Sequence, residues 1–333
     1  MKTPLTGWAD SPASQRREPT AGEVANGFSC GPPDRELFNE LFYRSTGNAL
    51  EIKSVCDEAG IPLTDGVFTN LRDALRLLYP RNNASPTIWV RTDGNDANDG
   101  SANTSGAALA TINAAITLGK RLYNLAGVNL TVRLGNTGTY APIEVLGCAG
   151  TITILGDAAA QDSYIISGAR PMYAQAANIV LRGLQLYNND TSHSTCHAAY
   201  LGAIFLDDVT LGGSGSTNTG TSHLYADTGG VITAQGDIKV QSNQGSAFFC
   251  RGGDIQITTG IACSFAGSPS FALATATVRG PNMMQMQGVV FSGAANGARY
   301  SIAANGVIDT NGESTSFIPG SSAGAVSSGG QYV

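Results

Sequence analysis

Two aspartates in the second half of the chain could do acid–base chemistry together. Asp237 and Asp254 each follow a glycine and precede an alternating apolar pattern, in GDIKV and GDIQI, with the same spacing as the repeat described below. If that spacing is one turn of a stacked structure, the two carboxyl groups lie about 5 Å apart, the distance between neighbouring strands. Retaining glycosidases use two carboxyl groups at that separation. The other interpretation, which we favour, is that each aspartate accepts hydrogen bonds from nearby backbone amides in a tight turn.

A histidine-containing segment is the second place where chemistry could occur. His193 and His197 flank Cys196 in NNDTSHSTCHAAY, which ends at Tyr200. Neutral imidazole and thiolate groups are good ligands for a transition metal. The composition is equally typical of a surface loop, where receptor contacts are common. We predict no metal here and favour a plain surface loop between coils. The alternative is that His193, His197 and Tyr200 contact a receptor or a second subunit.

A run of aspartates and asparagines, TDGNDANDG, offers many oxygen atoms to a hard cation such as calcium. Its candidate ligands are Asp93, Asp96 and Asp99. The run is not an EF-hand loop, because it has no glutamate at the twelfth position. Asp-Gly and Asn-Asp sequences also make tight turns without an ion. We predict turns rather than a calcium site.

The rest of the sequence excludes several classes of function. It has no Gly-rich phosphate loop, no GxSxG nucleophile elbow and no HExxH pair, and we expect no cofactor. The net charge is −6, and the only lysines are Lys2, Lys53, Lys120 and Lys239, so binding to a nucleic-acid backbone is not expected. No run of about 18 apolar residues predicts membrane insertion, and no secretory signal is visible at the start. The six cysteines form no CxxC pair and are expected to be buried, reduced thiols.

The elements that must position these residues are short strands separated by glycine and polar turns. Only 13% of residues are charged and 42 of 333 are glycine. Units of strand, turn and strand begin at Val231, Phe248, Phe265, Asn282 and Tyr300, so the interval is seventeen three times and then eighteen. A fixed period of this kind predicts a solenoid, in which each unit buries its apolar face against the next.

We therefore predict an all-β fold, a parallel β-helix over residues 87–309, with about 17–29 residues per coil. The longer coils are expected before the regular repeat, where the strands are more widely spaced in sequence. The alternative is an antiparallel β-sandwich, whose short strands also recur along the chain.

Two segments flank the predicted β-helix. Residues 1–86 form an N-terminal arm with nearly half of the charges and two predicted helices, one beginning at Pro33 and one over Thr69–Tyr79. Isolated helices of this length are marginal in water, so we expect the arm to pack on other subunits or another protein. The residues expected to make these contacts are Trp8, Phe28, Leu37, Phe38, Leu41 and Phe42.

The Gly/Ser-rich end, residues 310–333, has few apolar residues. We therefore expect Phe317, Ile318 and Tyr332 to lie between subunits. At the other end of the β-helix, a predicted helix over residues 111–126 caps the first coil.

Three stretches carry a resemblance to bacteriophage tail fibres and tailspikes. IWVRTDGNDANDGSANTSGAALATINAAI (Ile88–Ile116) resembles the opening of their right-handed β-helix, where a strand, a "GxDxNDG" loop and an "FATIxxAI" helix lead into the coils; Leu109 takes the usual aromatic place. GFSCGPPDRELFNELFYR (Gly27–Arg44) is similar to an element near the N-termini of many tail-fibre proteins. FIPGSSAGAVSSGGQYV resembles the ends of small phage fibre proteins.

The resemblance implies a structural protein of the virion tail, made in the host cytoplasm. It implies a homotrimer that attaches to other tail proteins through residues 1–80 and contacts a glycan or protein of the host surface. Many tailspikes of this architecture cleave polysaccharide, so a glycoside hydrolase or lyase is an alternative to an adhesin. A purely structural fibre on the head, collar or tail is a third possibility. We expect an adhesin, because no catalytic signature is present.

Overall fold

The computed structural model describes residues 50–58, 60, 85–126, 128–213 and 221–333. The chain divides into two compact units, Met1–Arg81 and Asn82–Val333. In the first unit, residues 50–58 are helical, and Lys53 Nζ lies 2.7 Å from a carboxylate oxygen of Asp57 one turn on. This helix was not predicted from the sequence. The two predicted arm helices lie outside the described residues.

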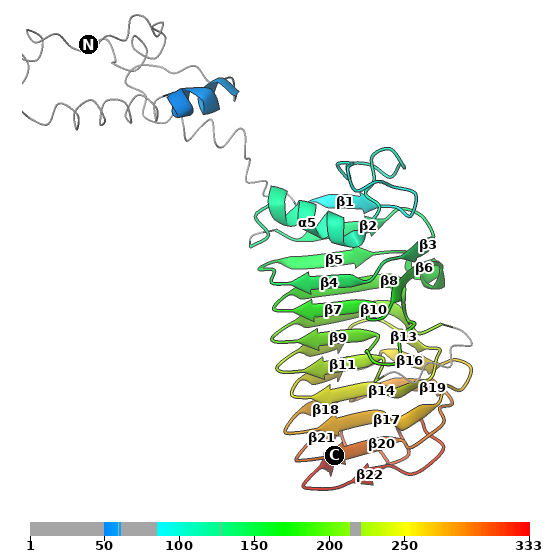
Figure 1. The fold of residues 1–333 in the computed structure, drawn as a ribbon. Helices are drawn as coiled ribbons and strands as arrows, with labels where there is room; N and C mark the ends of the chain where they lie inside the picture. The colour runs from blue at the N-terminus through cyan, green and yellow to red at the C-terminus, as the bar shows by residue number, and fades with distance from the viewer. Residues whose placement is uncertain (1–49, 59, 61–84, 127, 214–220) are drawn as a thin grey trace, which may run out of the picture. The chain divides into compact units, whose positions relative to one another are not determined.

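The second unit is a parallel β-solenoid of about eight turns (Figure 1). Its strands form one sheet of 15 strands and one of eight. Within each sheet, neighbouring strands pair in parallel. This confirms the predicted fold class and rules out the antiparallel sandwich for this unit. No helix in the part of the chain that the structure describes is long and apolar enough to cross a membrane.

Three flat faces make up each coil, where a coil is one full turn of the chain. The larger sheet bends into two of them, because β8 and β10 each turn a corner midway, at Gly183 (φ 61°) and Asp208 (φ 53°). Face 1 contains β1 (Thr87–Val90), β2 (Leu130–Leu134), β5 (Thr151–Leu155), the first parts of β8 (Asn178–Asn188) and β10 (Ala203–Leu211), β12 (Val231–Ala234), β15 (Asp254–Ile257), β18 (Met283–Gln285), β21 (Val307–Asp309) and β23 (Gln331–Tyr332). Face 2 contains β3 (Gly138–Tyr140), β6 (Tyr164–Gly168), the second parts of β8 and β10, β13 (Ile238–Val240), β16 (Ala262–Phe265) and β19 (Val290–Gly293).

Face 3 is the eight-stranded sheet. It contains β4 (Ile143–Leu146), β7 (Met172–Gln175), β9 (Cys196–Ala199), β11 (Leu224–Asp227), β14 (Gln244–Arg251), β17 (Phe271–Arg279), β20 (Tyr300–Ala303) and β22 (Ala325–Val326). In Figure 1 these strands follow one another down the side that faces the viewer.

Columns of identical or similar side chains fill the interior. On face 1 the register stacks one buried residue per coil: Leu130, Ile152, Ile179, Ile204, Ile232, Ile255, Met284 and Ile308. β-Branched side chains suit this arrangement, because a strand restricts them little and lets them pack on the pleated surface. Burial of each such side chain stabilises the fold by roughly 1.5–3 kcal/mol.

The coil length differs from the period seen in the sequence. Successive members of the face 1 column, from Leu130 to Ile308, are between twenty-two and twenty-nine positions apart. The seventeen-residue interval instead joins strands on different faces, such as Ile238 of β13 and Ile255 of β15. A coil holds three strands, so similar strand and turn units recur every third of a coil. The interval of seventeen is therefore about two thirds of a turn.

The corners of the coils differ in how much their length varies. Between face 3 and face 1 the connections have two to four residues. A residue with positive φ lies at each of these corners: Gly147, Ala176, Tyr200, Thr228, Gly252, Gly280, Ala304 and Ser328. This left-handed conformation turns the chain sharply within few residues. Between face 2 and face 3 the connections range from two residues, after β3, to twelve, after β10.

A helix covers the first coil. Helix α5 (Ile112–Leu122) begins at the N-cap Thr111, whose hydroxyl accepts a hydrogen bond from the amide of Ala114. The helix agrees with the one predicted over residues 111–126, but it ends four residues earlier. Gly119 packs against the strand below, where a Cβ atom would lie 2.5 Å from Leu130 Cδ2.

The solenoid continues to the end of the chain. In the Gly/Ser-rich segment, β22 pairs with β20 and β23 pairs with β21. Ile318 is fully buried in its own chain, the Phe317 ring lies 5.1 Å from Phe291, and Tyr332 stacks on Tyr300 at 4.6 Å. The expectation that these residues lie between subunits is wrong for Ile318, because it is fully buried within its own chain. For Phe317 and Tyr332, which are partly exposed, it stays a prediction.

Candidate functional site

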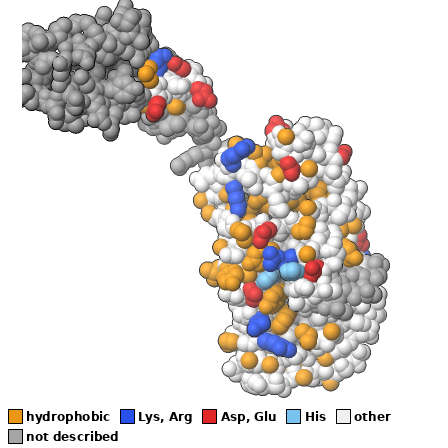
Figure 2. Space-filling view, viewed as in Figure 1, with side chains coloured by type: hydrophobic (Ala, Val, Ile, Leu, Met, Phe, Trp, Pro, Cys, Tyr) orange, Lys and Arg blue, Asp and Glu red, His pale blue; other side chains and the backbone are white. Residues whose placement is uncertain are grey.

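The outer side of face 3 carries a column of aromatic rings, one per coil. Residues alternate between core and outer side along each strand, so Tyr173, His197, Tyr225 and Phe249 lie on the outer side in register. Tyr173 is only 8% exposed, and the other three rings are partly exposed. Their ring centroids are 5.1, 4.7 and 5.2 Å apart in succession. Figure 2 shows histidine, basic and acidic side chains among apolar ones along the middle of this side of the solenoid.

The column is built by the same alternation that fills the core. In β9 the side chain of Cys196 is buried in the interior and the next residue, His197, lies on the outside. In β11 the corresponding pair is Leu224 and Tyr225. Each ring therefore stays in place because its neighbour in sequence is locked in the apolar interior.

Charged side chains lie beside the rings of the column. The guanidinium group of Arg170 lies 3.9 Å from the centre of the Tyr173 ring and 3.5 Å from a carboxylate oxygen of Glu144. His197 Nε2 lies 3.3 Å from Asp227 Oδ1. Burial lowers the pKa of His197, although the Asp227 carboxylate partly opposes this effect. His197 is therefore neutral near pH 7.

The tyrosines of the column are protonated over the same range. Burial, and then the nearby Asp227 carboxylate, raises the pKa of Tyr225, while Arg251 opposes the shift. Burial also raises the pKa of Tyr173. Near neutral pH the rings of the column are thus uncharged. They lie against one another, Arg170 covers Tyr173, and the partly exposed parts of His197, Tyr225 and Phe249 face outward beside arginines and carboxylates.

This arrangement suits the binding of a sugar chain. Aromatic rings supply flat apolar surfaces, and Tyr and His add hydrogen-bonding atoms at their edges. Flanking arginine and carboxylate groups add directional hydrogen bonds. Such convergent apolar and polar groups on a rigid sheet are typical of recognition sites.

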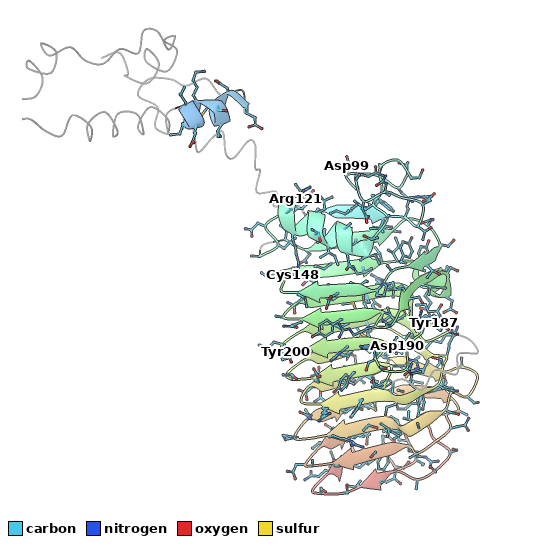
Figure 3. The ribbon with its side chains drawn as sticks, viewed as in Figure 1. Asp99, Arg121, Cys148, Tyr187, Asp190 and Tyr200 are labelled. Carbon is cyan, nitrogen blue, oxygen red and sulfur yellow. The ribbon has the colours of Figure 1, made fainter. Side chains whose placement is uncertain are left out.

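The segment with the predicted histidine site is split between the two edges of face 3. His193 lies in the connection before β9, where its Nδ1 is 3.2 Å from Asp190 Oδ1, and Tyr200 lies just after β9. Figure 3 shows Asp190 and Tyr200 on opposite edges of the sheet. Cys196 points into the core, so a metal held jointly by His193, Cys196 and His197 is not formed.

Tyr200 and its neighbour are unusual for a tight corner. Tyr200 and Leu201 both have positive φ, at 47° and 63°, and are 54% and 78% exposed. Bulky residues seldom adopt this conformation. The corner therefore holds two apolar side chains out into solvent beside the aromatic column.

The two aspartates proposed as a stacked pair do not stack. Asp254 is level with Val231 on face 1, whereas Asp237 lies at the corner between faces 1 and 2, where its carbonyl accepts from Val209. The prediction that the pair is one strand spacing apart is wrong, because it used the seventeen-residue interval as one coil. Each carboxylate instead accepts a hydrogen bond from an amide of the next coil, Asp237 from Ala262 and Asp254 from Met283. This agrees with the favoured interpretation that these carboxylates bind backbone amides.

The Asp-rich loop is held by hydrogen bonds of its own. Asp96 accepts from the amides of Ala110 and Thr111 at 2.8 Å and so caps the entry to α5. Asp93 is paired with Arg91, and Asp99 accepts from Ser101. Among the described residues, no group of three or more His, Cys, Asp or Glu side chains is arranged to hold a metal ion.

The predicted contact residues of the arm lie outside the described residues. They are Trp8, Phe28, Leu37, Phe38, Leu41 and Phe42. Their roles remain predictions.

Sequence reasoning did not single out the aromatic column. Of its four rings, only His197 is a candidate on sequence grounds, and nothing in the sequence alone connects it with Tyr225 or Asp227. The missed signal is the interval between successive rings, which is twenty-four, twenty-eight and twenty-four positions from Tyr173 to Phe249. Those intervals match the true coil length rather than the shorter period of the repeat.

Comparison with protein-family models, curated proteins and solved structures finds no match for this chain.

Proposed function

We propose that this protein is a bacteriophage tail fibre or tailspike that acts as an adhesin. In this proposal residues 1–80 attach it to other tail proteins, and the solenoid contacts a glycan of the host surface. The support is threefold: the phage-like motifs of the sequence, the parallel β-solenoid that such motifs introduce, and the outer side of face 3. The protein would be made in the host cytoplasm and carried in the virion as a homotrimer.

The observation that carries the proposal is the aromatic column of Tyr173, His197, Tyr225 and Phe249. Outward-facing aromatic rings at regular intervals on a rigid sheet do not fill the core of the same chain. Aromatic rings offer large apolar contact areas, and adjacent rings let a repeating polymer make such a contact more than once.

Binding to purified bacterial surface polysaccharides tests the adhesin. The wild-type protein and a variant with Tyr173→Ala and Tyr225→Ala would be applied to immobilised capsular and O-antigen polysaccharides. We expect binding by the wild type and at least a tenfold loss in the variant. The control is Tyr187→Ala, on a different face. Equal binding by all three proteins would mean that face 3 is not the receptor site.

Attachment through the arm has its own test. Deleting residues 1–32 should leave a folded, soluble solenoid and abolish incorporation into phage particles. Full occupancy of particles by the truncated protein would show that the arm is not the anchor. A monomeric mass for the full-length protein in light scattering would contradict the trimer.

One observation favours the enzymatic alternative. His197 Nε2 and Asp227 Oδ1 lie 3.3 Å apart, and neither atom has a satisfactory hydrogen bond within the described residues. A carboxylate-oriented neutral histidine beside tyrosines and arginine could act as a base in polysaccharide cleavage by a lyase. The test is to incubate the protein with the polysaccharide. Release of shorter oligosaccharides by the wild type, but not by His197→Gln, would favour the lyase over the adhesin.

A further inference from the structure

We propose that the outer side of face 3 selects acidic polysaccharides, whose sugar carboxylates bind Arg170, Arg251 and Arg279 while the sugar rings lie on the aromatic column. This inference rests on the proposed function and specifies the class of glycan.

The charge on this side is opposite to that of the solenoid as a whole. Residues 85–333 contain ten basic and 14 acidic side chains, which leaves a net charge of −4. Five of the ten basic side chains lie on face 3 or at the end of α5 that contacts it. They are Lys120, Arg121, Arg170, Arg251 and Arg279.

Only three acidic side chains among the described residues lie on the same side: Glu144, Asp190 and Asp227. Each of the three is already close to a basic or hydrogen-bonding group. Glu144 lies near Arg170, Asp190 accepts from the Ser192 and His193 amides, and Asp227 lies beside His197. Arg251 is itself level with Asp227 in the strand register. Five basic against three acidic side chains still leave a net positive charge on this side, which favours an anion from outside.

The arginines are placed to meet a polymer that runs along the column. Arg251 and Arg279 end β14 and β17 and are exposed on neighbouring coils. Arg170 lies on Tyr173 three strands away and is 33% exposed. Its ion pair with Glu144 is long, at 3.5 Å, and exposed pairs of this kind contribute little. A guanidinium group can then form two parallel hydrogen bonds with a sugar carboxylate.

The column itself adds no charge that would weaken this selection. His197 is neutral near pH 7, because burial lowers its pKa. In this proposal the partly exposed rings of Tyr225 and Phe249 contact the sugars without regard to charge, while Tyr173, 8% exposed, positions Arg170. Stacking would thus supply affinity, and the arginines would supply discrimination between acidic and neutral sugars.

A second copy of the chain is a less suitable occupant of this surface. Two copies that meet through face 3 bring like charges together, five basic against three acidic on each side. Like-charge contacts oppose association. An acidic polymer has the opposite sign and gains from the same groups.

The experiment measures dissociation constants for a set of purified capsular polysaccharides, acidic and neutral, and for carboxyl-reduced forms of the acidic ones. Reduction converts each carboxylate to a primary alcohol and keeps the sugar backbone. We expect binding of acidic members only, with at least a tenfold loss after reduction, because reduction removes the charge-assisted hydrogen bonds to the arginines. Arg251→Gln and Arg170→Gln should each weaken binding about tenfold.

A matched control is Arg182→Gln on face 1, where the arginine is exposed and lies 3.1 Å from Asp207. It should change binding by less than twofold. If Arg251→Gln fails to fold, Arg279→Gln on the next coil repeats the test.

The outcomes separate the two proposals. Binding of neutral members, or binding unchanged by carboxyl reduction, overturns the acidic selection and leaves the adhesin intact. Binding of no polysaccharide contradicts both. A lower oligomeric mass for Arg251→Gln in light scattering would make face 3 a subunit interface and refute the glycan site.

Discussion

Protonation of one buried histidine should limit the stability of the solenoid in acid. His223 is fully buried just before β11, where its Nε2 lies 2.8 Å from the Ser242 carbonyl and its Nδ1 lies 3.3 Å from Thr195 Oγ1. A neutral imidazole has one donor and one acceptor. Nε2–H therefore donates to Ser242, and Nδ1 accepts from the Thr195 hydroxyl. A second proton on the imidazole would place a positive charge in the apolar interior. The two hydrogen-bond partners, the Ser242 carbonyl and the Thr195 hydroxyl, carry no negative charge to balance it.

The size of this loss of stability follows from the pKa of His223. Burial lowers the pKa of His223 from 6.5 to about 4, against the smaller opposing effect of the Ser242 carbonyl. Between these two values the unfolded chain binds a proton that the folded chain does not, so stability falls as the pH falls. The loss is about 2 kcal/mol at pH 5 and about 3 kcal/mol below pH 4. Above about pH 7 the group contributes no pH dependence.

The assay compares urea unfolding of the wild type and His223→Gln at pH 7.5 and pH 5. Glutamine keeps an N–H donor for the Ser242 carbonyl and does not titrate. Carboxylates also titrate in acid, so the measured quantity is the difference between the two proteins. We expect the wild type to lose about 2 kcal/mol more than His223→Gln over this range. His193→Gln, at an exposed position, should follow the wild type. Parallel pH profiles for the wild type and His223→Gln would refute the reasoning.

Three further predictions concern the packing of the solenoid. Ile204→Ala removes a fully buried member of the face 1 column and should lower the free energy of unfolding by about 2–5 kcal/mol, measured in denaturant, with Thr233→Ala on the outside as control. Gly150→Ala would press a Cβ against the backbone oxygen of Leu125 and should cost about 1–3 kcal/mol, seen as a lower melting temperature; an unchanged melting temperature would mean that the close approach is absent. Asp96→Ala removes the acceptor for two amides at the start of α5 and should cost about 1–2 kcal/mol. Millimolar calcium should leave the wild-type melting temperature unchanged. A calcium-dependent rise in the wild type that is absent from Asp96→Ala would instead support a calcium site in this loop.

The sequence indicated the class of fold because strand spacing and low charge are properties of single segments. Alternation in TITIL and LTVRL identifies strands, and Thr111 identifies the start of the capping helix. The coil length was missed because it depends on pairing between distant segments. Similar turn sequences precede strands on different faces. GDIKV and GDIQI therefore resemble each other, although GDIKV leads into a strand of face 2 and GDIQI into a strand of face 1.

The same cause explains the missed site. Tyr173 and His197 are ordinary residues in their own segments, and only the register places them 5.1 Å apart. Asp227 meets His197 through the next coil. Once the true length of a coil is known, both contacts can be derived from the sequence.

The unequal lengths of the connections between faces determine where this protein can tolerate insertions during evolution. Connections between face 3 and face 1 keep two to four residues, whereas those between face 2 and face 3 range from two to twelve. The long ones, before β9 and β11, end where the strands carrying His197 and Tyr225 begin. An insertion there alters the border of the candidate site and leaves the hydrogen-bonded ladders in register. Such insertions can therefore reshape the border of the candidate site while the interior columns of the solenoid stay the same.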